Sequence, residues 1–322
     1  MKSRISIAVA LVAFFAVSLP GRAADPDMLK LVMPDAKVIA GVNVVEARNS
    51  PFGQYLLSQT TAKNADLEKL TALVGFDPRR DITELLMASS GEQKSGLVLV
   101  RGVFDIAKIG AFAQQNGATT LDYAGSTIFI DPKKTGGVTF ADPTLAILGD
   151  IVSVKAALDR RSSPTTLPAH TLSGIAQWSL QDAWVVSVGL PASVKLPQGA
   201  PAQITQQPSI QSIKEFDGGL KFGSSVAVTA RAVADTNQNA TTLVGVIQLL
   251  TNLMQMQSAQ NPQAATLLKS LLVTATGNAV DLSWSIPQDQ LEQMLKANHE
   301  AGPATVAPKG STRAPRRTER KM

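Results

Sequence analysis

Residues 119–150 read TTLDYAGSTIFIDPKKTGGVTFADPTLAILGD, and this stretch decides the fold. Short runs of β-branched and aromatic residues alternate in it with turn-forming residues, which is typical of strands joined by tight turns. The pattern predicts four strands, at 119–123, 126–131, 137–141 and 144–149. The turns contain Gly125-Ser126, the segment 131–136, and Asp142-Pro143. Because links this short join antiparallel neighbours, the stretch predicts an antiparallel sheet.

The chain on both sides of this stretch contains further elements of the same kinds. Asp105 and Asp150 are good N-caps, and each precedes a predicted helix, at 105–116 and 150–160. Apolar residues at helical spacing predict further helices at 50–58, 64–74, 172–180 and 239–258. Alternating β-branched runs predict further strands at 37–44, 85–89, 96–103, 184–190, 216–222, 226–233, 271–276 and 279–286.

The predicted elements occur twice in a similar order: strand, helix, two strands, helix, strands, helix. We therefore expect an α+β fold made of two tandem halves of mainly antiparallel sheet, with helices packed on one face. The expected N-terminal half is 24–160 and the expected C-terminal half is 183–300. Between them, 161–182 is expected to be a proline-marked linker with a short helix.

The first 23 residues have the parts of a cleaved secretory signal peptide. Lys2 and Arg4 precede an apolar run that is shorter than a membrane-spanning helix needs. Small residues follow a proline, so we expect cleavage after Ala23. A chain that is exported without any cysteine suits a bacterial periplasm or exterior. We therefore predict a periplasmic or secreted protein, with no transmembrane segment in the mature chain.

Composition excludes several classes of site. The chain has no cysteine and only two histidines, which excludes thiolate chemistry and leaves little for a metal site or a histidine-based triad. No phosphate-binding or dinucleotide-binding glycine motif is present, so we expect neither a metal nor a cofactor. The net charge of +5 comes from the ends: 1–23 carry +3 and 301–322 carry +5, which leaves −3 for 24–300. A basic nucleic-acid-binding body is therefore disfavoured.

Two local motifs carry a resemblance. Gly75-Phe-Asp-Pro-Arg-Arg-Asp81 precedes a predicted strand, and Thr144-Leu-Ala-Ile-Leu-Gly-Asp150 leads into Val154-Lys-Ala-Ala-Leu-Asp159. These segments resemble stretches of uncharacterised secreted bacterial proteins with tandem α+β halves. The resemblance covers most of 28–297 and implies that architecture. The family has no established activity, so the resemblance implies no site residues.

The segment from Thr236 to Leu268 contains no charged residue across 33 positions. Its apolar side chains recur at helical spacing, and amides occupy the opposite side. One interpretation is an amphipathic helix packed on a sheet. The other is a groove or lid that meets an apolar ligand or a protein partner, where methionines adapt to the bound surface. The candidate ligand or partner face consists of Leu243, Ile247, Leu250, Met254 and Met256.

Two basic features are candidates for anion binding. Arg79 and Arg80 follow Asp77-Pro78, and a guanidinium group can bind a carboxylate or phosphate through two hydrogen bonds. The alternative is a connector in which the arginines pair locally. The tail 301–322 has a composition typical of disorder and could contact anionic envelope polymers weakly.

These features favour an exported, non-catalytic protein that binds a ligand or serves as an envelope-associated scaffold. No catalytic residue can be named from the sequence. The alternative is a periplasmic hydrolase or isomerase with a site assembled from scattered Asp, Glu, Ser and Arg residues. Paired carboxylates such as Glu215 and Asp217 are candidates for acid–base work only if they are buried. An apolar pocket with two inward carboxylates would favour the enzyme.

Overall fold

A computed structural model describes residues 24–61, 65–91, 96–191, 208–257, 267–268 and 270–293. The predicted signal peptide and the basic tail lie outside these residues. The described strands form one sheet, and each of them pairs with its neighbours in the antiparallel direction. The strands are β1 (Val38–Asn43), β2 (Ile82–Ser89), β3 (Leu97–Gly102), β4 (Thr119–Tyr123), β5 (Ser126–Ile130), β6 (Gly137–Asp142), β7 (Leu145–Gly149), β8 (Ala183–Val188), β9 (Ile213–Phe222), β10 (Ser225–Ala234), β11 (Leu272–Thr276) and β12 (Ala279–Pro287).

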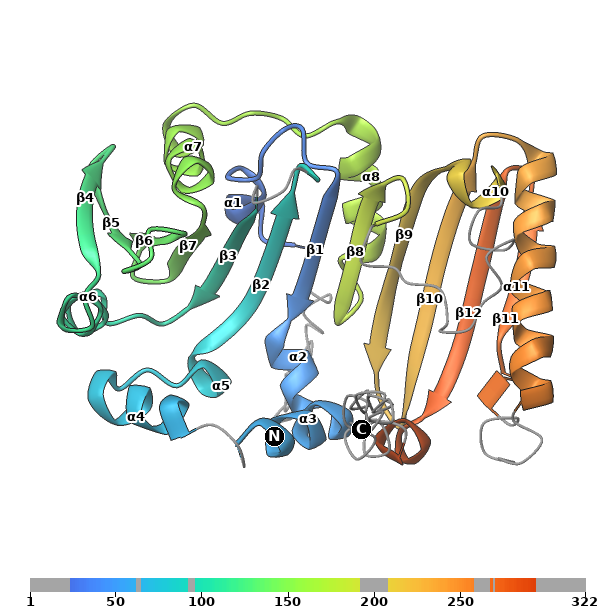
Figure 1. Cartoon of the computed structure of the whole chain (residues 1–322), viewed down its shortest axis with the longest axis horizontal. Coiled ribbons are helices and arrows are strands. Elements are labelled where there is room, and N and C mark those ends of the chain that lie inside the picture. The colour runs from blue at the N-terminus through green and yellow to red at the C-terminus, as the bar shows by residue number, and fades with distance from the viewer. Residues whose placement is uncertain are drawn as a thin grey trace, which may run out of the picture.

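Two halves of this sheet meet at its centre. The order is β11-β12-β10-β9-β8-β1-β2-β3-β7-β6-β5-β4, so the first strands of the two halves, β1 and β8, pair with each other. Outward from that pair, each half continues with a hairpin, β2-β3 or β9-β10, followed by the last strand of that half, β7 or β12. Figure 1 shows the sheet as one continuous layer, with β4 at its left end and β11 at its right end. The α+β fold with tandem antiparallel halves is confirmed.

The described helices are distributed around this sheet (Figure 1). They are α1 (Pro26–Leu29), α2 (Val44–Asn49), α3 (Pro51–Thr61), α4 (Ala65–Val74), α5 (Pro78–Asp81), α6 (Ile106–Gln115), α7 (Ile151–Ser162), α8 (Ala169–Trp178), α10 (Pro208–Gln211) and α11 (Asn237–Gln257), with a final helical segment at 288–293. The caps that the sequence predicts are present: Asp105 accepts a hydrogen bond from the backbone N–H of Lys108, and Asp150 from that of Ser153.

The helices divide between the two faces of the sheet, although the sequence pattern led us to expect one face. Strand register defines an Ile39 face and an Ala40 face, because side chains alternate along each strand. Helices α1, α7 and α8 pack on the Ile39 face, whereas α6 and α11 pack on the Ala40 face. The reason lies in strands such as β3, where Leu97-Val-Leu-Val100 is apolar at consecutive positions and needs cover on both sides.

The largest core cluster lies on the Ile39 face and spans both halves. Leu86 and Leu99 of the first half and Val186 of the second half belong to it, and each of these side chains is buried. A second cluster lies under α6 and a third under α11. The α1 segment also belongs to the largest cluster, with Met28 fully buried. The N-terminal part of the described chain is thereby anchored to the central strands.

Candidate functional site

Helix α6 packs on the Ala40 face against β5, and Phe129 of β5 lies beneath it. Ile106 and Ile109 of α6 belong to the same core cluster as residues of β6 and β7. The approach is close: a methyl group on Gly110 would lie 2.7 Å from Cζ of Phe129. Only glycine fits at this position without displacing the ring, even though glycine costs about 1 kcal/mol relative to alanine inside a helix. The Phe129 ring therefore packs directly against the backbone of α6 at Gly110. Phe129 also lines two clefts, which lie between α6 and the sheet.

The first of these, which we call the apolar cleft, has a volume of about 450 Å³. Its wall on the helix side includes Ile109 and Ala113, and its floor includes Val138 and Leu148 of the sheet. Its lining is predominantly apolar, and its volume lies within the range of about 300–1,000 Å³ that is typical of small-molecule sites. This combination makes it the strongest candidate ligand site in the described part of the chain.

The one carboxylate in the lining of the apolar cleft, that of Asp131, is engaged by its own turn. It accepts hydrogen bonds from the backbone N–H groups of Lys133, Thr135 and Gly136, and from the Thr135 hydroxyl. Burial on its own would raise the pKa of Asp131, but these hydrogen bonds outweigh it and the pKa lies below its ordinary value. The group is thus a charged structural acceptor at the rim, poorly suited to exchange protons with a ligand.

The second cleft, on the other side of Phe129, is larger and more polar. Its volume is about 630 Å³, and Gln114, Thr127 and Arg161 contribute polar groups to its lining. Ala111 of α6 lines it, as Ala113 of the same helix lines the apolar cleft. The two alanines therefore provide a matched pair for testing which cleft receives a ligand.

A third cavity brings together the carboxylates that an enzyme would need, but it is too small for a substrate. Glu215, Asp217 and His170 line it beside Ser187, and its volume is about 10 Å³. That volume is at most enough for a single water molecule. Burial raises the pKa of Asp217, and the negative charge of Glu215 raises it further. The backbone N–H of Ser187, 3.3 Å from Oδ1, donates a hydrogen bond that partly opposes this rise.

We expect Asp217→Asn to stabilise the protein at neutral pH. An aspartate whose pKa is raised by folding binds more protons in the native state, so stability falls as pH rises from its unfolded pKa of about 3.9 through the folded pKa. The asparagine amide does not ionise, so it avoids this fall in stability, and its oxygen can still accept the hydrogen bond from the Ser187 N–H. The melting temperature of the variant should exceed that of the wild type at pH 7, and the two should converge in acid. A variant that melts lower at pH 7 would show that His170 and Arg231 make the ionised form favourable.

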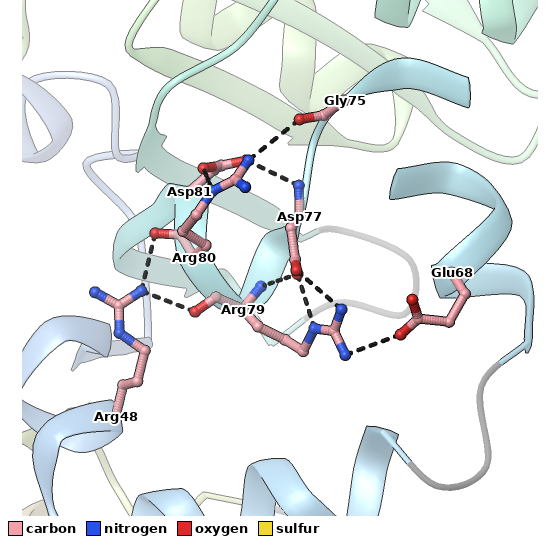
Figure 2. Close-up of polar contacts among 7 residues, drawn as sticks. All are labelled: Arg48, Glu68, Gly75, Asp77, Arg79, Arg80 and Asp81. Atoms are coloured by element: carbon pink, nitrogen blue, oxygen red, sulfur yellow. Dashed lines mark hydrogen bonds and ion pairs between the residues drawn. The ribbon is translucent and has the colours of Figure 1, made fainter. Parts of the chain in front are cut away.

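The structure places Arg79 and Arg80 in a cluster of compensating charges (Figure 2). Arg79 donates to both carboxylate oxygens of Asp77, at 2.8 and 2.9 Å, and also pairs with Glu68 at 3.0 Å. Arg80 donates to both oxygens of Asp81, at 2.6 and 2.8 Å. These hydrogen bonds from the arginines hold the pKa values of Asp77 and Asp81 below their ordinary range.

The same cluster ties three helices together. Arg48 of α2 donates to the backbone carbonyls of Arg79 and Arg80 in α5, both at 2.8 Å, while Glu68 comes from α4 (Figure 2). An incoming anion would have to compete with carboxylates that already bind both guanidinium groups in a bidentate manner. The geometry therefore favours the alternative of local pairing, and anion binding by these arginines stays a prediction.

The structure divides the candidate face on α11. Leu243 is 4% exposed and, with Ile247 partly buried, packs above β11 and β12 in the third core cluster. Leu250 is half-buried, whereas Met254 and Met256 are 41% and 75% exposed. Only the C-terminal end of this set is therefore accessible to a ligand or partner. Within the described residues no helix is both long and apolar enough to cross a membrane.

Sequence reasoning did not find the clefts beside Phe129. The lining residues of each cleft come from four separate elements and the loops between them, and most of these residues by themselves are typical of an ordinary core. One usable signal was present: Gly110 lies inside the predicted helix 105–116. A glycine inside a helix often marks a close approach, here to Phe129.

Comparisons with known proteins give a fold and no family. No family model matches the chain, and no curated protein sequence matches it. Among solved structures, crystal form III of TP0453 matches with a TM-score of 0.53 and 12% identity, covering 84% of this chain and 97% of that one. Crystal form I of TP0453 matches with a TM-score of 0.50 and 12% identity, covering 85% and 98%. At this identity the similarity shows a shared fold alone.

Proposed function

We propose that the protein is an exported, non-catalytic binding protein or envelope-associated scaffold that holds a small apolar ligand in the apolar cleft. The observation that carries the proposal is the cleft itself: about 450 Å³, predominantly apolar in lining, with Asp131 as its single carboxylate. Ligand sites combine apolar walls with a few polar groups in this way. Export rests on the sequence of residues 1–23, since the signal peptide lies outside the described residues.

The hydrolase or isomerase alternative has weaker support. It requires an apolar pocket with two available carboxylates, and the apolar cleft offers one that is committed to its turn. The cavity that does contain two carboxylates, Glu215 and Asp217, has room for about one water. A general acid or base must come within hydrogen-bond reach of its substrate, which that cavity does not allow without rearrangement.

The test is binding of an uncharged apolar dye such as Nile red, followed by fluorescence. Ala113→Phe places a phenyl ring in the apolar cleft, and we expect the dye to bind about tenfold more weakly, a loss of ~1.4 kcal/mol. Ala111→Phe is the matched control, because it makes the same change on the same helix in the second cleft. Equal affinities for the wild type and Ala113→Phe would overturn the assignment of the ligand to the apolar cleft.

A further inference from the structure

The two edges of the sheet differ in a way that points to a partner. The edge strand β4 carries Asp122, and the hydroxyl of Tyr123 beside it contacts Asp159. Charges on edge strands discourage pairing with another chain. The opposite edge, β11, reads Leu-Val-Thr-Ala-Thr and has neither a charge nor a proline. From Thr236 to Val280 the sequence contains a single charged residue, Lys269, and α11 itself carries none. Asp281 of β12 lies opposite Thr274, and its charge is compensated by Arg231 at 2.7 Å.

The β11 edge is fixed in place and accessible. Gly277 and Asn278 form a two-residue hairpin loop between Thr276 and Ala279, with Gly277 at a φ of 61°. Asn278 ties this loop to the end of β10, through hydrogen bonds between its backbone and side chain and the backbone of Ala234. Helix α11 lies over β11 on one face, yet Leu272 remains 65% exposed and Thr274, Ala275 and Thr276 are also exposed.

The hairpin geometry fixes which backbone groups point outward. The residues that flank a two-residue loop form a hydrogen-bonded pair, and the pairs alternate from there along the strand. Thr276, Thr274 and Leu272 therefore direct their N–H and C=O groups towards β12. Val273 and Ala275 direct theirs towards the open edge, where no described strand pairs with them.

We propose that this edge pairs with the β11 strand of a second copy of the chain, antiparallel and centred on Thr274. In that register Val273 of each copy lies opposite Ala275 of the other copy. Each of these two pairs exchanges two backbone N–H to C=O hydrogen bonds, which gives four across the interface. Thr274 faces Thr274 of the second copy, and Leu272 faces Thr276. A two-fold interface brings identical surfaces together, which like charges would oppose. The uncharged composition of β11 and α11 removes that obstacle.

Analytical ultracentrifugation of the full mature chain over a range of concentrations tests the proposal. We expect a monomer–dimer equilibrium in the wild type. Thr274→Lys should weaken it at least tenfold, because two lysines would face each other across the two-fold axis. In the monomer, the new lysine lies opposite Asp281 on an exposed strand, so folding should be retained. The matched control is Thr120→Lys on the edge strand β4, which should leave the equilibrium unchanged.

A charge exchange tests the register itself. Thr274→Glu should also weaken self-association, and an equimolar mixture of Thr274→Lys and Thr274→Glu should restore the dimer, since lysine then faces glutamate. A wild-type chain that stays monomeric at every concentration would overturn the proposal. So would a Thr274→Lys variant that dimerises as the wild type does, or a mixture of the two variants that fails to associate. None of these outcomes bears on the apolar cleft, which lies in the other half of the sheet.

Discussion

Trp184→Ala is expected to lower the free energy of unfolding by about 3–5 kcal/mol, as removal of a buried tryptophan does. Trp184 is 6% exposed and belongs to the core cluster that spans both halves. Its register partner across the β1–β8 pair is Gly41, and the indole occupies the space above that glycine. The substitution would open a cavity where the two halves join, and chemical denaturation followed by circular dichroism would measure the loss.

A double-mutant cycle separates this packing from other effects. A methyl group on Gly41 would lie 2.4 Å from the Trp184 ring, so Gly41→Ala alone should cost about 1–3 kcal/mol through overpacking. In the double variant the methyl group enters the space that the indole has left. The loss in free energy of unfolding should therefore be smaller than the sum of the losses in the two single variants. A Trp184→Ala loss below about 1 kcal/mol, or two separate unfolding transitions, would show that the halves do not share a core.

The strands could be predicted because turn-forming residues mark where each one begins and ends. A tight turn such as Gly277-Asn278 can join two strands only as an antiparallel hairpin, and the structure has hairpins at the predicted turns. The pairing of β1 with β8 could not be predicted in this way. Ile39 and Val186 are distant in sequence, and each belongs to a run that would suit several positions in a sheet. Complementarity between Gly41 and Trp184 becomes visible only once the two strands lie side by side.

The candidate sites show the same limit. The run Asp77-Pro-Arg-Arg-Asp81 left anion binding and local pairing both open, and the geometry favours local pairing because Glu68 and Arg48 arrive from other helices. Those two residues carried no signal of their own in the sequence. The uncharged helix was correctly located, but its amphipathic pattern extends beyond the region that the sheet covers. Periodicity identifies the apolar side of a helix without showing how far its packing continues.

The α11 helix therefore gives a prediction that varies along its length. Leu243→Ala should cost about 2–5 kcal/mol, because the side chain is 4% exposed among Ala240, Val280 and their neighbours. Met256→Ala should change stability by less than ~0.5 kcal/mol, because Met256 is 75% exposed. Leu250→Ala should fall between them. Midpoints of urea denaturation at an unchanged m-value would give all three differences.

The order of these three values distinguishes the two roles that the sequence left open for this helix. A packed helix loses stability in proportion to the burial that the sheet provides, so the cost should decline towards its C-terminal end. If Met256→Ala destabilised the fold as much as Leu243→Ala, the exposed end would have to be covered, and a role for the methionines in binding would lose its basis. The expected decline would leave Met254 and Met256 as accessible apolar side chains on an uncharged surface beside the β11 edge.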